Sequence, residues 1–98
     1  MYRVDTKCIL LNLLSKRKEL TTEDLISYKL KSNSDIYFDI SDDSVCFTVE
    51  RNSSIFQWHG DNVKLSPNLD KKYFQRLKDS NNNLIPERIR STVLACLQ

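Results

Sequence analysis

The chain has 98 residues, of which 40% are hydrophobic and 29% are charged, and its formal net charge is +2. This balance favours one small folded domain and excludes a disordered tail. A net charge this small is no argument for nucleic-acid binding by itself. The single glycine excludes the glycine-rich loops that hold nucleotide phosphates, because those loops need several glycines.

The cysteines indicate where the protein works. Cys8, Cys46 and Cys96 are odd in number and far apart, which argues against both a disulfide framework and a zinc cluster. We expect reduced, mostly buried thiols, an intracellular (cytoplasmic or nuclear) location, and no metal or cofactor. The apolar run at residues 8–14 is too short to span a membrane, and its flanks do not resemble a signal peptide. We therefore expect no membrane partner.

The first third of the chain predicts two helices, at residues 5–17 and 20–30. Asp5 is suited to cap the first helix. Thr21 and Asp24 have the spacing of a capping box for the second. The apolar side chains with helical spacing are Ile9, Leu10, Leu13 and Leu14 in the first helix, and Leu25, Ile26 and Leu30 in the second.

From residue 35 onward, apolar residues alternate with polar ones, which is typical of strands. Residues 35–41 and 44–51 are predicted to form two strands, with a turn at Ser-Asp-Asp-Ser, residues 41–44, between them. Phe38 and Phe47 would then be core residues. A short third helix, starting at Ser34 or Asp35, is the alternative for residues 35–41.

The only Trp, His and Gly of the chain are consecutive, at Trp58, His59 and Gly60. Residues 55–58 and 63–65 are predicted to be strands, with Gly60 in the turn between them. Either Phe56 or Trp58 faces the core. A buried Trp58 would close the hairpin, whereas an exposed one would serve as an interface anchor. His59 is expected to be solvent-exposed.

The last third predicts two more helices. Residues 66–78 begin with a Ser66 cap and a proline, and the polar run at residues 79–83 ends that helix. Residues 84–98 form the last helix, with Pro86 near its start. The predicted fold class is α+β in one domain, residues 1–98. It has two N-terminal helices, a small antiparallel β-sheet of two to three strands, and two C-terminal helices.

Residues 6–65 resemble a winged-helix domain. The leucine-rich helix in CILLNLLSKRKELTTEDLISYKL, followed by SDIYFDISDDSVCFTVERN, is similar to the N-terminal domain of zinc-finger antiviral proteins and to LOTUS domains. That resemblance implies a third short helix, a strand pair and a non-enzymatic module that binds RNA, DNA or a protein. The sequence departs from the pattern in having an acidic strand pair, and residues 66–98 would be an added helical pair.

Charge is distributed unevenly along the chain. Residues 1–34 carry seven basic and four acidic groups, residues 35–66 two and six, and residues 67–98 six and three. Any contact with nucleic-acid phosphates should therefore come from the helices. The candidate nucleic-acid-binding residues are Lys16, Arg17, Lys18, Lys29, Lys31, Lys71, Lys72 and Arg76.

No pattern in the chain indicates catalysis. A Cys46–His59 pair lacks an oxyanion loop, and the acidic residues near position 42 lack the spacing of a calcium loop. We therefore expect no enzyme activity, but a protein-interaction or adaptor module, in the manner of a viral or host-defence factor. The candidate partner-binding residues are Tyr37, Trp58 and His59. Nucleic-acid binding through the basic helices is the alternative, and a homodimer is left open.

Overall fold

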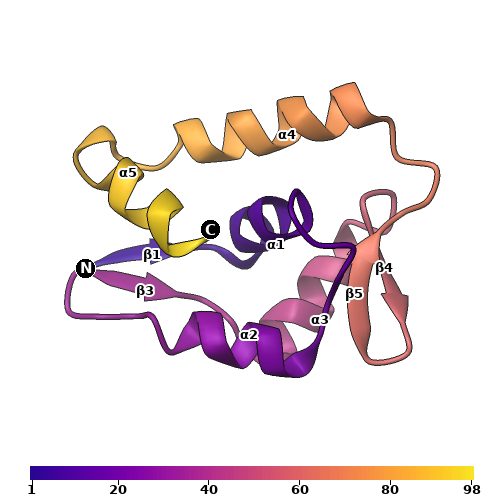
Figure 1. Cartoon of the computed structure of the whole chain (residues 1–98), viewed down its shortest axis with the longest axis horizontal. Helices are drawn as coiled ribbons and strands as arrows, with labels where there is room; N and C mark the ends of the chain where they lie inside the picture. The colour runs from indigo at the N-terminus through magenta and orange to yellow at the C-terminus, as the bar shows by residue number, and fades with distance from the viewer.

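A computed structural model describes all 98 residues, and it confirms an α+β fold. A three-stranded antiparallel sheet lies at one end of the molecule and a parallel strand pair at the other (Figure 1). The elements in chain order are β1 (Tyr2–Val4), α1 (Thr6–Leu14), β2 (Glu19–Leu20), α2 (Thr22–Lys29), β3 (Ile36–Phe38), α3 (Asp42–Arg51), β4 (Phe56–His59), β5 (Asn62–Leu65), α4 (Lys71–Asn83) and α5 (Glu87–Cys96).

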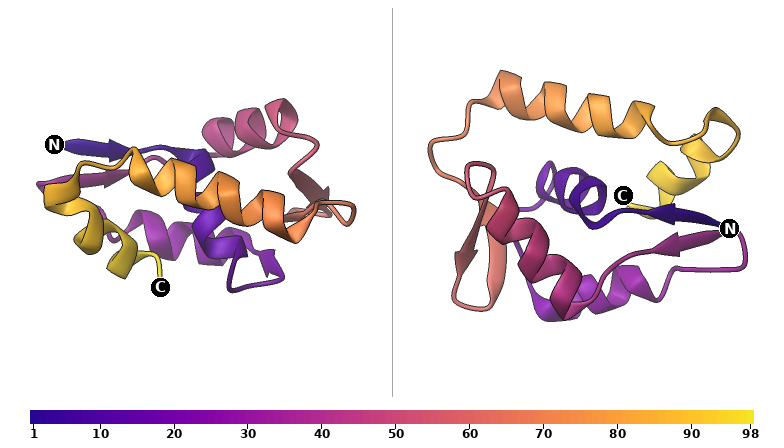
Figure 2. Two further views of the ribbon diagram at one scale, coloured as in Figure 1. Left: turned by 90° about the horizontal axis from the view of Figure 1, so that it is seen from above. Right: turned by 180° about the vertical axis from the view of Figure 1, so that it is seen from behind.

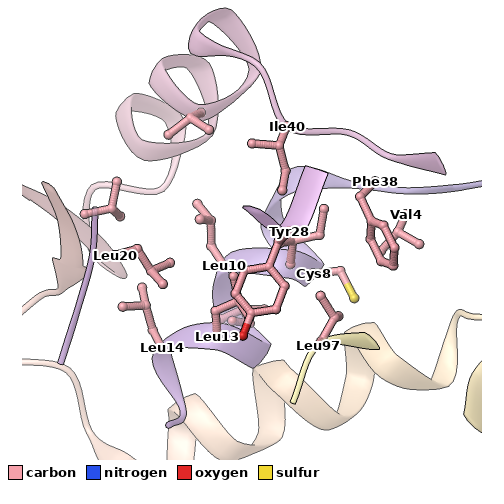
Figure 3. Packing of buried hydrophobic residues seen from close by; sticks show 14 of the residues in the cluster. Val4, Cys8, Leu10, Leu13, Leu14, Leu20, Tyr28, Phe38, Ile40 and Leu97 are labelled. Carbon is pink, nitrogen blue, oxygen red and sulfur yellow. The ribbon is translucent and has the colours of Figure 1, made fainter. Parts of the chain in front are cut away.

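Helix α1 is the centre of the core. Eight of its nine residues are buried, as expected for a helix that is apolar on every side. Asp5 caps the helix by accepting a hydrogen bond from the Cys8 amide. Helix α4 covers α1 on one side, and α2 and α3 cover it on the other (Figure 2). Figure 3 shows Leu10 and Leu13 among other buried side chains, which include Tyr28 of α2, Leu20 of β2 and Leu97.

The N-terminal strand β1 was not predicted. It pairs in parallel with β3, in a register that places Tyr2 opposite Ile36 and Val4 opposite Phe38. Val4, Ile36 and Phe38 are almost fully buried. The strand predicted at residues 35–41 is therefore confirmed over residues 36–38, but its partner precedes α1 instead of following it in a hairpin.

The predicted strand at residues 44–51 is wrong, because these residues belong to helix α3. Ser41 and Ser44 form a capping box, so the presumed turn is the start of the helix. Val45 and Val49 are four residues apart and share one buried helical face. Phe47 is 55% exposed on another face, instead of lying in the core. The apolar residues Val45, Phe47 and Val49 alternate as in a strand, but Val45 and Val49 also have the spacing of one helical face.

The three-stranded sheet has the order β2-β5-β4. Strand β2 was not predicted, and Leu20 was expected to begin the second helix. The strand places the fully buried Leu20 opposite Val63. Gly60 has a φ of 62° in the two-residue turn between β4 and β5. This is the left-handed region that a tight hairpin requires and that glycine adopts without strain.

Helix α4 begins and ends later than predicted. Asp70, not Ser66, is its N-cap, and the polar run at residues 79–83 continues the helix. Within this run Asn82 lies against α1, where Asn12 and Asn82 exchange hydrogen bonds of 2.7 and 3.0 Å. Asn12 is buried and Asn82 is half-buried, so the pair helps to fix how the two helices meet, because the buried Asn12 amide cannot be left unpaired at low cost.

Cys8 lies beside this amide pair. Burial, with a smaller contribution from the Asp5 carboxylate, raises the pKa of the Cys8 thiol to about 12. The thiol is therefore protonated at neutral pH and unreactive. Cys46, in contrast, is exposed and Cys96 is half-buried. The prediction that the thiols are mostly buried is therefore wrong, since only Cys8 is buried.

None of the five helices has the length and apolar character needed to cross a membrane.

Alanine substitutions distinguish helix from strand at α3. Val45→Ala and Val49→Ala should each lower the free energy of unfolding by about 1–3 kcal/mol, because each removes a buried side chain. Phe47→Ala should change it by less than about 0.5 kcal/mol, because that ring is largely exposed. Chemical denaturation measures all three. Equal losses from the three variants would indicate a strand with one buried face.

Candidate partner-binding groove

An open groove of about 410 Å³ lies between α2, the start of α3 and strand β4. Six of its eleven lining residues are hydrophobic, and its volume falls in the range of ligand-binding pockets. The lining residues are Thr22, Leu25, Ile26, Lys29, Ile40, Ser41, Asp42, Val45, Cys46, Trp58 and Asp61.

Strand alternation places Trp58 in this groove. Phe56 and Trp58 are two residues apart on β4, so their side chains leave the same face of the sheet. Phe56 is 1% exposed and enters the core, whereas Trp58, nearer the turn, is 38% exposed. Phe56 is thus the β4 residue that fills the core, and Trp58 forms one wall of the groove.

Helix α2 forms the second wall. Thr22, Leu25, Ile26 and Lys29 have the spacing of one helical face, and all four line the groove. Tyr28 takes the position that faces the core. Ile26 and Leu30, which were assigned with Leu25 to one apolar stripe, are 53% and 78% exposed.

The start of helix α3 forms the third wall. Val45 and Ile40, both 4% exposed, belong to the core and also line the groove. Asp42 and Cys46 are exposed at its edge. Asp42 and, from the hairpin turn, Asp61 form no ion pair within the chain, whose salt bridges lie elsewhere. Two unpaired carboxylates therefore border an apolar surface.

His59 does not join the groove, because it leaves β4 on the opposite face of the sheet from Trp58. Its Nδ1 lies 3.0 Å from the Glu19 carboxylate, which also accepts a hydrogen bond from the Asn62 amide. These hydrogen bonds, that from His59 first, lower the pKa of Glu19. His59 is solvent-exposed, as predicted, but it joins β2 to the hairpin and does not line the groove.

Tyr37 also lies apart. It is on β3, opposite Arg3 of β1, at the end of the molecule away from the hairpin (Figure 1). Of the three candidate partner-binding residues, the structure therefore places only Trp58 in the groove.

Three of the predicted nucleic-acid-binding residues are held by contacts within the chain. Lys16 and Lys31 donate hydrogen bonds to the Leu97 and Cys96 carbonyls, at 3.4 and 3.0 Å. Arg17 donates to the Tyr28 hydroxyl at 3.0 Å, and the Tyr28 hydroxyl donates to the Gln98 carbonyl. These residues attach the C-terminal end of α5 to the rest of the domain.

The other basic candidates do not form one surface. Lys18 lies with Lys16, Arg17 and Lys64 around a shallow depression beside β2, whereas Lys29 lines the groove. The remaining three, Lys71, Lys72 and Arg76, are exposed on α4. Figure 2 shows α4 and α2 on opposite sides of α1.

The structure does not bring Cys46 and His59 together. Cys46 lies on α3, not on a strand next to His59 as supposed, and it lines the groove that His59 does not face. No three His, Cys, Asp or Glu side chains gather to hold a metal ion.

Comparisons with family models, with curated proteins and with solved structures found no match to this chain.

The Glu19–His59 contact predicts a pH dependence. Since the pKa of Glu19 in the folded chain is lowered below the usual value of about 4.3, the contact stabilises the hairpin above that pH. This stabilisation is lost as the pH falls through the lowered pKa. NMR titration of the Glu19 carboxyl carbon measures the shift. His59→Ala should move the pKa toward about 4.3, whereas Gln57→Ala, on the same face, should not; an unchanged titration in His59→Ala would contradict the assigned cause.

Proposed function

We propose that this chain is a non-enzymatic, winged-helix-like module that binds another protein through the groove between α2, α3 and β4. Protein binding is favoured by the exposed apolar walls of the groove and by the acidic residues at its edge.

The order of elements supports the winged-helix part of the proposal. From residue 6 to residue 65 the chain forms α1, β2, α2, α3 and the hairpin β4–β5. Strand β3, between α2 and α3, is an addition to this order. The hairpin β4–β5 pairs with β2, in the order β2-β5-β4. In this interpretation α3 is the third helix and the hairpin is the wing. A fold of this kind does not choose between nucleic acid and protein as partner.

The charges of α3 favour a protein over a nucleic acid. Asp42, Asp43 and Glu50 are exposed on this helix, and Arg51 is its only basic residue. The guanidinium of Arg51 lies 4.1 Å from the centre of the Phe47 ring. A third helix placed against a phosphate backbone would present three carboxylates to it, which is repulsive.

The observation that carries the proposal is the exposure of Ile26 and Trp58 on facing walls of one groove. Isolated exposed hydrophobic residues are common on proteins. Here two large ones line the same groove, whose lining residues Leu25, Ile40 and Val45 belong to the core or pack against it. Tryptophan is among the residues that most often dominate the energy of a protein interface.

Photo-crosslinking tests this surface. A photoreactive amino acid at Thr22, on the groove edge, should yield a discrete crosslinked protein in extracts of the source cells. Trp58→Ala and Ile26→Ser should each reduce that product at least tenfold, because they remove anchor side chains.

The matched control is Tyr73→Ala, which removes an aromatic side chain that is 45% exposed on α4. It should leave the crosslinked product unchanged. A product that survives both groove substitutions would refute the groove as the binding surface.

A nucleic-acid partner is the second candidate, and the shallow depression around Lys16, Arg17, Lys18 and Lys64 favours it. Lys18 and Lys64 are the two basic residues there whose side chains make no hydrogen bond or ion pair within the chain, although Lys64 lies opposite Glu19. Labelled single- and double-stranded RNA and DNA should then bind in low salt and dissociate as salt is raised. Lys18→Gln/Lys64→Gln should weaken binding about tenfold, whereas Arg88→Gln, exposed on α5, should not. No binding at low salt would exclude this candidate.

A further inference from the structure

We propose that the groove accepts a short basic segment of another protein, in which apolar anchor side chains are flanked by Lys or Arg. This inference rests on the proposed function and specifies the chemistry of the partner.

The acidic edge of the groove comes from two separate elements. Asp42 lies at the first position of α3, and Asp61 lies in the turn of the hairpin. Both are exposed, and neither has an ion-pair partner within the chain. Lys29 is the only basic residue of the lining, so the lining carries a net negative charge.

Further carboxylates extend this charge beyond the edge of the groove. Asp43 follows Asp42, and Glu50 follows the lining residue Cys46 by one helical turn. Both are exposed. The positive end of the α3 dipole offsets part of this negative charge. Two carboxylates nevertheless lie in the first turn of α3, and the Ser41 side chain already accepts a hydrogen bond from one of the free amides there.

The charge of the groove disfavours two other occupants. The phosphates of a nucleic acid would be repelled by the same carboxylates. A second copy of this chain, joined groove to groove by a twofold axis, would place Asp42 and Asp61 of both copies at one interface. Like charges at an interface oppose association. A basic segment meets the carboxylates favourably while its apolar side chains contact Ile26 and Trp58.

Selection from a display library of random 16-residue peptides tests the inference. The library is selected on the wild-type chain after removal of peptides that bind Trp58→Ala, so that the survivors depend on the groove. We expect survivors enriched in Lys and Arg on either side of apolar residues. The intrinsic fluorescence of Trp58, the only tryptophan, should shift when a survivor is added.

Charge-removing variants then test the cause. For a synthesised survivor, Asp42→Asn/Asp61→Asn should weaken binding about three- to tenfold, and raising the salt should remove most of this difference. Asparagine is tolerated both in a first helical turn and in a turn loop, so the variant should fold. The matched control, Asp35→Asn/Asp79→Asn, removes the same charge from exposed positions outside the groove and should bind as the wild type does.

Each other outcome overturns a defined part of the account. Groove-dependent peptides that are neutral or acidic would overturn the basic partner and leave the groove as a protein-binding surface. If no peptide in the library distinguishes the wild type from Trp58→Ala, both the basic partner and the groove as a protein-binding surface would be overturned. A dimer in analytical ultracentrifugation that Trp58→Ala dissociates would show that a second copy occupies the groove, and would also overturn the basic partner.

Discussion

The fold depends on covering helix α1 on every side. With eight of nine residues buried, this helix cannot face water along any stripe, so it needs partners all round. Helices α2 and α3 lie on one side of it and α4 on the other (Figures 1 and 2). The same requirement explains the Asn12–Asn82 pair. Asn12 is the only side-chain amide on α1, it is buried, and its hydrogen-bond partner Asn82 lies on α4.

This requirement leaves the groove open. The core takes Tyr28 from α2, Val45 and Val49 from α3, and Phe56 from β4. Ile26 and Trp58 both line the groove between these three elements, where they remain 53% and 38% exposed. Several basic residues near α1, in contrast, are occupied in holding the C-terminal end of the chain. The groove residues are therefore available to a partner, whereas those basic side chains already make hydrogen bonds within the chain.

Local signals predicted part of this structure. The caps at Asp5 and Thr21 and the hairpin turn at Gly60 are short-range features, and each lies where expected. Residues 44–51 were misread because Val45 and Val49 satisfy both the strand and the helix period. Strands β1 and β2 were missed because two or three residues carry no period. For the groove, its rarity singled out Trp58. The apolar stripe that contained Ile26 did not show which of its members another element covers, so the exposure of Ile26 was missed.

The central claim is that Trp58 lies in an open groove with a negative edge, and quenching of its fluorescence by ions tests this most directly. Caesium and iodide are added at matched ionic strength, and each is normalised to a free tryptophan amide. Both ions should reach Trp58, and caesium should quench more strongly than iodide relative to that standard. The difference should be smaller in Asp42→Asn/Asp61→Asn. A tryptophan shielded from both ions, or quenched preferentially by iodide, would contradict it.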